Sequence, residues 1–359
     1  MRDSRQASFT RIGIVSAFCC AGLLALFVLD RDAASGWGTA VLWAVLAPAM
    51  IALGAAVSIE DKARVALTGR GVGRAMRRGH LALHYQPKVD VATGKVSAVE
   101  ALVRWQHPRK GEIPPDRFVP QVERSRLVHR FNAFVIEEAV RQASAWRTNG
   151  LPLRVAVNVS PACLGPELVG QVRGILDRHR LPAHLLRLEI TEHGAQDVAA
   201  DFERSADSLN RFHELGMSIA LDDFGTGQSS LARLVALPVD MIKIDRSFVM
   251  PMLVDPLRAE VVHMAILLAH AAGLRVVAEG VETEEHMKHL AALGADFAQG
   301  YCISRPMPAA ELVAWIERRA GVAAQLDEVL PDSETLPKPR RLPLTRPVRV
   351  AAPSLPARG

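Results

Sequence analysis

The pattern of apolar and polar positions changes at about residue 60. Before that point the chain contains two apolar runs without a charged residue, at residues 12–29 and 37–58. The first run has 18 residues, about the shortest length that spans a bilayer as a helix. In the second run Trp37 and Trp43 lie toward one end, as interface anchors do. We therefore predict a two-helix transmembrane hairpin within residues 1–66.

The distribution of lysine and arginine predicts the orientation of this hairpin. Three arginines precede the first run, Arg31 alone lies between the runs, and six Lys or Arg residues follow between residues 62 and 78. The positive-inside rule places both flanks in the cytosol. The basic stretch could also contact anionic lipid headgroups. A cleaved signal peptide is the alternative for the first run, although a second apolar run follows it directly.

From about residue 80, β-like apolar runs alternate with amphipathic helical stretches. The β-like runs lie at residues 153–160, 185–191, 217–223, 240–245, 274–280 and 295–301. Two of the helical stretches end at Gly216 and Gly273, a usual stop signal for a helix. Repeated strand–helix units over about 240 residues predict an α/β fold with a parallel sheet, closed into a (β/α)8 barrel.

Nearly every β-like run ends in a polar residue that an apolar strand does not require. These residues are Asn158, Glu189, Asp222, Lys243, Glu279 and Gln299. In a parallel barrel the carboxyl ends of the strands meet at one face, where barrel enzymes carry their chemistry. We therefore expect the six side chains to converge on one pocket. The alternative is that each is a solvated strand end.

The adjacent acids Asp222 and Asp223 sharpen this expectation, because like charges side by side require either a positive partner or full hydration. Together with Glu189, Glu279 and the carbonyl group of Asn158 they form an oxygen-rich set that suits Mg²⁺ or Mn²⁺. A carboxylate that bridges two cations is the arrangement used to activate water in phosphoester hydrolysis. In such a site Lys243 could orient the nucleophilic water or offset phosphate charge.

Composition excludes several other chemistries. The four cysteines have no spacing typical of metal ligands or of a disulfide framework, and the 12 histidines are scattered rather than clustered as in zinc enzymes. The net charge of +5 is concentrated at the two ends of the chain, so it is weak evidence for an anionic partner.

Eight motifs between residues 75 and 318 together resemble the EAL-domain cyclic di-GMP phosphodiesterases. They read YQPKVD, VEALVRWQHP, NVS, LEITE, DDFGTG, IKIDRSFV, VVAEGVET and QGYCISRPMP, in that order. The resemblance implies a modified (β/α)8 TIM-like barrel in which one strand is antiparallel to the rest. It also implies hydrolysis of cyclic di-GMP to linear pGpG with two Mg²⁺ or Mn²⁺ ions, in a homodimer, without a nucleic-acid polymer as partner.

The resemblance also assigns roles to individual residues. It implies that Glu100, Asn158, Glu189 and Asp222 hold the first cation, and that Asp222 and Asp223 hold the second. Lys243, Glu279 and Gln299 match the residues that position and activate the attacking water. Gln86 and Arg104 match substrate contacts, and Glu192 and Glu282 match a supporting shell. Gln228 departs from the family pattern, because many members carry an aromatic residue there, beside a loop that couples the dimer to metal binding.

Three regions follow from these arguments. We expect a membrane hairpin at residues 1–66, an EAL phosphodiesterase domain at residues 67–320, and a disordered Pro- and Arg-rich tail at residues 321–359. The catalytic domain is expected in the cytoplasm, at the bacterial inner membrane. Two alternatives remain open: a catalytically silent cyclic di-GMP receptor or scaffold, and a barrel metalloenzyme with another anionic substrate.

Overall fold

The computed structural model describes residues 54, 58–59, 61–191, 202–226 and 237–324, without the side chains of residues 202–205 and 320–324. Ten strands form one sheet: β1 Leu81–Asp90, β2 Val96–His107, β3 Gly111–Ile113, β4 Val155–Asn158, β5 Leu186–Thr191, β6 Ser218–Phe224, β7 Met241–Ile244, β8 Arg275–Glu279, β9 Phe297–Gln299 and β10 Met307–Pro308. The main helices are α3 Pro115–Glu123, α4 Val128–Thr148, α5 Pro166–His179, α7 Phe202–Glu214, α9 Arg246–Val249, α10 Pro256–Ala271, α11 Glu284–Leu293 and α12 Ala309–Ala324.

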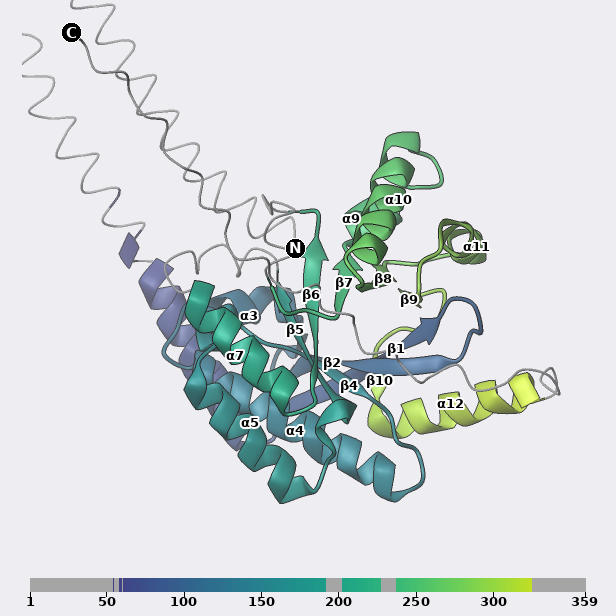
Figure 1. Ribbon diagram of the computed structural model, residues 1–359. Helices are drawn as coiled ribbons and strands as arrows, with labels where there is room; N and C mark the ends of the chain where they lie inside the picture. The colour runs from purple at the N-terminus through teal and green to yellow at the C-terminus, as the bar shows by residue number, and fades with distance from the viewer. Residues whose placement is uncertain (1–53, 55–57, 60, 192–201, 227–236, 325–359) are drawn as a thin grey trace, which may run out of the picture.

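Eight of these strands close into a barrel. The strands β2, β4, β5, β6, β7, β8 and β9 pair in parallel in that order, and β1 closes the ring by pairing antiparallel with both β2 and β9. The predicted barrel with one antiparallel strand is therefore confirmed. Figure 1 shows α4, α5 and α7 on one side of the strands and α10 and α11 on the other.

Two apolar layers hold the barrel together. The outer faces of the strands pack with the surrounding helices in the main core, which includes Ile136, Leu188 and Ile242. Inside the barrel, four neighbouring strands each contribute one residue to a separate small cluster: Ala220, Met241, Val277 and Phe297. Because side chains alternate across a strand, the residue two positions after Ala220 is Asp222, on the same interior face. The apolar cluster is thus a dry floor beneath the polar strand ends.

A third apolar cluster attaches the N-terminal helix, residues 61–77, to the barrel. Val72 and Ala75 of this helix pack with Trp105 of β2 and with Phe118 and Phe131 of α3 and α4. At the start of the helix Asp61 pairs with Arg124, which follows α3. The helix that connects the predicted membrane hairpin to the barrel is therefore fixed to β2, the strand that carries Glu100 and Arg104.

Within the described residues, no helix is both long enough and apolar enough to cross a membrane. The two runs predicted as spans, residues 12–29 and 37–58, lie outside the described residues except for Gly54 and Ser58. Most of the predicted tail, residues 325–359, also lies outside them.

Candidate metal centre

The strand-end residues meet at one mouth of the barrel, as the sequence pattern predicted. Backbone pairing places Asn158 beside Glu189, and Glu279 beside Gln299. On the antiparallel side Gln86 of β1 pairs with Glu100 of β2. Glu100 and Gln299, 199 positions apart in the chain, are therefore neighbours, because parallel strands bring their carboxyl ends to the same edge.

The ammonium group of Lys243 lies at the centre of the acidic residues. Its Nζ is 2.6 Å from Glu189 Oε2, 2.7 Å from Glu279 Oε1, 3.0 Å from Asp222 Oδ2 and 3.4 Å from Glu100 Oε2. The Lys243 side chain is 1% exposed, whereas the side chains of Asp222 (11%) and Glu279 (20%) are partly exposed. The positive charge of Lys243 thus offsets part of the repulsion among the four carboxylates. Without that charge they would not remain this close.

Two side-chain amides complete the surroundings of Glu100. Asn158 donates from Nδ2 to Glu100 Oε1 at 2.7 Å, and Gln299 donates from Nε2 to Glu100 Oε2 at 2.6 Å. The bond from Asn158 uses its amide nitrogen, which leaves its carbonyl oxygen for another partner. Glu100 itself is 5% exposed, and the amides and Lys243 supply the donors that a buried carboxylate needs.

The pKa shifts of the acids differ in direction, which indicates that the positive charge of the lysines does not stabilise every carboxylate equally. Burial opposes the charged form of Glu189, but the Lys243 and Lys88 ammonium groups outweigh it and lower the pKa of Glu189 to about 2. Burial raises the pKa of Glu279 to about 7 and raises the pKa of Asp222 well above its usual value, although Lys243 opposes both shifts. Burial also opposes the charge on Lys243, but the four carboxylates raise its pKa overall. The centre therefore favours additional positive charge.

The donor set fits a divalent cation. Glu100, Glu189 and Asp222 each offer a carboxylate oxygen, and these atoms lie within 4.8 Å of one another. Oxygen ligands of this kind suit Mg²⁺ and similar hard cations. In addition, Gln299 Oε1 is buried without a hydrogen-bond partner among the described residues. An unsatisfied buried acceptor beside the acids provides a place for a water molecule to donate a hydrogen bond.

Asp223 is held in an unusual backbone conformation. Its φ angle is +57°, which a residue other than glycine rarely adopts, and the β6–β7 register shifts between Leu221 and Phe224. The Asp223 amide donates to Asp222 Oδ1 at 2.8 Å, and the Thr226 hydroxyl donates to the Asp223 carbonyl at 2.8 Å. The left-handed conformation thus falls on the second of two consecutive acids, and backbone strain of this kind is typical of functional sites. Gln228 lies outside the described residues.

The predicted substrate contacts lie at the same mouth. Gln86 donates from Nε2 to the Ser304 carbonyl at 3.1 Å, and its Oε1 accepts from Gln299 Nε2 at 3.2 Å. Arg104 lies four residues after Glu100 on the same face of β2, nearer the carboxyl end of the strand. Its Nε is 3.5 Å from Glu112 Oε1, and its side chain is 14% exposed. The Arg104 guanidinium group, held by Glu112, is therefore placed to bind a phosphate oxygen at the mouth.

The predicted supporting shell is only partly visible. Glu192 lies outside the described residues. Glu282 is exposed, and among the described residues no hydrogen bond or ion pair is formed by its side chain. Its supporting role stays a prediction.

Sequence reasoning missed one charged residue in this centre, Lys88. The Lys88 side chain is fully buried in β1, and its Nζ is 3.2 Å from Glu189 Oε1. Burial lowers the pKa of Lys88, and Glu189 opposes that shift. The signal was present in the sequence, because Lys88 is two positions from Gln86 and therefore shares its face of the strand.

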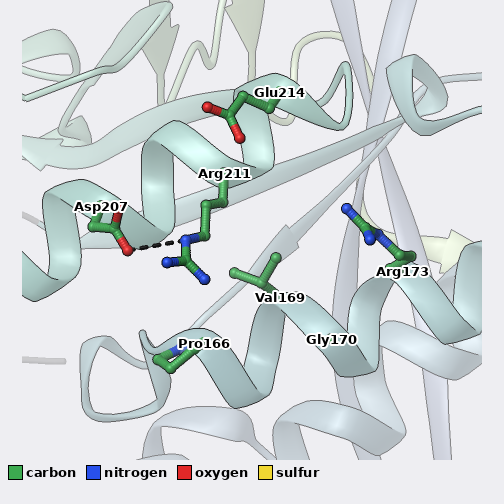
Figure 2. A pocket seen from close by; sticks show the side chains of 7 residues that line it. All are labelled: Pro166, Val169, Gly170, Arg173, Asp207, Arg211 and Glu214. Carbon is green, nitrogen blue, oxygen red and sulfur yellow. Dashed lines mark ion pairs between the residues drawn. The ribbon is translucent and has the colours of Figure 1, made fainter.

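A second concave feature lies outside the barrel, between α5 and α7. Figure 2 shows this groove, which has a volume of about 580 Å³, and an ion pair of 3.0 Å between Arg211 and Asp207, both on α7. Its lining is Pro166, Val169, Gly170, Arg173, Asp207, Arg211 and Glu214. None of the predicted site residues lines it, so the groove is separate from the metal centre.

Comparison with known proteins agrees with this geometry. The model of the EAL domain family matches residues 70–306, and the chain therefore belongs to that family. The bifunctional diguanylate cyclase/cyclic di-GMP phosphodiesterase MucR of Pseudomonas aeruginosa is 41% identical over 244 residues, which are 67% of this chain and 35% of MucR. The cyclic di-GMP phosphodiesterase NbdA of the same organism is 40% identical over 241 residues, which are 67% of this chain and 30% of NbdA.

Among solved structures, the PaMucR phosphodiesterase in complex with c-di-GMP is similar, with a TM-score of 0.65 and 39% identity. The match covers 68% of this chain and 99% of that structure. The matched region spans about a third of the length of the MucR and NbdA proteins.

A close backbone crossing fixes Gln299, and Gly300 makes it possible. A Cβ atom on Gly300 would overlap the backbone carbonyl and amide of Val281. At this crossing the Val281 amide donates to the Gln299 carbonyl at 3.1 Å, and the Cys302 amide donates to the Val281 carbonyl at 3.0 Å. The side chain of Gln299 thus reaches Glu100 from a backbone that has no freedom to shift.

We predict that Gly300→Ala lowers the free energy of unfolding by about 3 kcal/mol, because the added methyl group has no space. The matched control is Gly174→Ala on α5, where nothing lies within 4 Å of the added atom. That change should raise stability by about 0.5–1 kcal/mol, since alanine favours the helix. Chemical denaturation of the three proteins measures both effects. Equal midpoints for Gly300→Ala and the wild type would contradict the crossing described here.

Proposed function

We propose that this protein is a phosphodiesterase that hydrolyses cyclic di-GMP to linear pGpG with two divalent cations, Mg²⁺ or Mn²⁺. The observation that carries the proposal is the cluster of Glu100, Glu189 and Asp222 at the mouth of an EAL-family barrel, with carboxylate oxygens within 4.8 Å of one another. Relatives named as cyclic di-GMP phosphodiesterases, and a related structure in complex with c-di-GMP, support the choice of substrate.

In this proposal Glu100, Asn158, Glu189 and Asp222 hold the first cation, and Asp222 and Asp223 hold the second. When bound, such a pair lowers the pKa of a water molecule and neutralises charge on the leaving oxygen. Gln299 Oε1, which is buried and unpartnered among the described residues, accepts a hydrogen bond from the attacking water. Lys243 and Glu279, paired at 2.7 Å, hold the charge around that water in place. Arg104 and Gln86 bind and orient the substrate.

Direct assay separates this function from its main alternative. Incubation of the protein with cyclic di-GMP and Mg²⁺ or Mn²⁺ should yield pGpG. Binding of cyclic di-GMP without pGpG would instead identify a silent receptor or scaffold. Neither binding nor turnover would point to a different anionic substrate.

We predict that Glu100→Ala reduces turnover more than about 100-fold, because loss of a direct ligand should exceed the effect of losing an outer partner. The matched control is Glu285→Ala, which removes an exposed acid on α11. The variant's folding is checked by circular dichroism. Wild-type turnover in a folded Glu100→Ala protein would reject the assigned role.

We also propose that the chain is a homodimer through α10. This helix exposes three large apolar side chains, Leu257 (73% exposed), Met264 (57%) and Leu267 (50%), and Val254 (86%) lies just before its first residue. A helix that is apolar on both its inner and outer faces favours burial on both sides. Light scattering of the purified chain should give a dimer for the wild type and a monomer for Met264→Glu. Gln171→Glu, which adds the same charge to α5, should remain dimeric, and a dimeric Met264→Glu would contradict the interface.

Finally, we propose that residues 12–29 and 37–58 anchor the protein in the bacterial inner membrane, with the barrel in the cytoplasm. The unequal distribution of Lys and Arg around these runs supports this orientation. A topology reporter fused after residue 66 should report the cytosol. A periplasmic signal from that fusion would contradict the hairpin.

A further inference from the structure

Lys88 forms an ion pair with an acid of the centre, although neither the strand-end pattern nor the motifs give it a role. Its side chain has 0% exposure, and its only side-chain hydrogen bond to the described residues is the one to Glu189 Oε1, at 3.2 Å. An ammonium group has three donors. Burying it with a single acceptor therefore costs more free energy of solvation than that one hydrogen bond restores. A buried ion pair is not by itself a gain in stability. The arrangement therefore calls for a different explanation.

The position of Lys88 in the barrel suggests an explanation for its burial. On β1 the residue Gln86 pairs with Glu100, whereas Lys88 pairs with Ala98, two residues earlier on β2. Lys88 therefore starts one step deeper in the barrel than the acids and reaches up to Glu189 from below. Opposite Lys88, the other oxygen of Glu189 is 2.6 Å from Lys243. The two oxygens of Glu189 are thus held by different lysines, Oε1 by Lys88 and Oε2 by Lys243.

We propose that Lys88 is a positioning residue for the cation site: it holds Oε1 of Glu189 so that Oε2 stays directed at the cation. This inference rests on the proposed function, because it takes Glu189 to be a cation ligand. Ligating carboxylates are commonly oriented by outer hydrogen-bond partners, and loss of such a partner typically lowers metal affinity or activity by 10–100-fold.

A plain electrostatic role makes the opposite prediction. If Lys88 acted only as a nearby positive charge, it would repel a dication, and its removal would tighten cation binding. If it acts by orienting Glu189, its removal loosens cation binding. The sign of the change in affinity therefore separates the two explanations.

The experiment measures Mn²⁺ affinity of the full chain by electron paramagnetic resonance of free Mn²⁺, without substrate. The proteins are the wild type, Lys88→Met, Glu189→Gln and the double variant, with Lys110→Met as a control at an exposed lysine before β3. We expect Lys88→Met to bind Mn²⁺ about 10–100-fold more weakly and Lys110→Met to match the wild type. In the Glu189→Gln background, Lys88→Met should cause no further loss, because its effect acts through Glu189.

Lys88→Gln provides a second variant in case the methionine variant does not fold, with circular dichroism as the check. It keeps an N–H donor without the charge, and we expect its affinity to lie between those of the wild type and Lys88→Met. Unchanged or tighter Mn²⁺ binding by folded Lys88 variants would overturn the positioning role, as would a full loss in the Glu189→Gln background. A wild-type protein that binds no Mn²⁺ would instead overturn the proposed function itself.

Discussion

The arrangement of side chains at the mouth of this barrel depends on one set of ion pairs. The ammonium group of Lys243 lies within ion-pair distance of four carboxylates. Without it Glu100, Glu189, Asp222 and Glu279 would repel one another in a site that is largely buried. Lys88 and the buried Arg187 add positive charge near Glu189. The raised pKa values of Asp222 and Glu279 express the remaining imbalance. The structure is thus arranged to accept further positive charge.

The barrel makes this concentration of charge possible. Seven parallel strands bring their carboxyl ends to one face, and the antiparallel β1 adds Gln86 and Lys88 from the opposite direction. Beneath the acids, Ala220, Met241, Val277 and Phe297 form a dry floor that lowers the local dielectric and strengthens each ion pair. The tight crossing at Gly300 then fixes Gln299 against Glu100. Backbone packing and electrostatic interactions therefore both hold Glu100 and Gln299 in place.

Much of the centre could be predicted from sequence, because strand ends in a parallel barrel converge. Asn158, Glu189, Glu279 and Gln299 were found in this way, and the strand pairing places Asn158 beside Glu189 and Glu279 beside Gln299. Glu100 escaped that rule because β2 continues to His107 and pairs with β3 beyond it, so the acid lies within the strand. Only the motif resemblance identified Glu100.

Lys88 escaped both kinds of reasoning, for a physical reason. It lies on β1, the one strand of the closed barrel that runs against the other seven, where the strand-end rule does not apply. Lysine is also a residue that is almost never fully buried, so its burial is not expected from its type. The membrane runs, the Gln228 loop and Glu192 lie outside the described residues, and those parts of the account stay predictions.

The most direct test of the charge argument is anomalous X-ray scattering from crystals of the protein grown with Mn²⁺. The account predicts two manganese peaks at the mouth of the barrel, one bound by Glu100, Glu189 and Asp222 and the other within reach of Asp222 and Asp223. Crystals soaked in saturating Mn²⁺ that showed no anomalous peak among these carboxylates would contradict it.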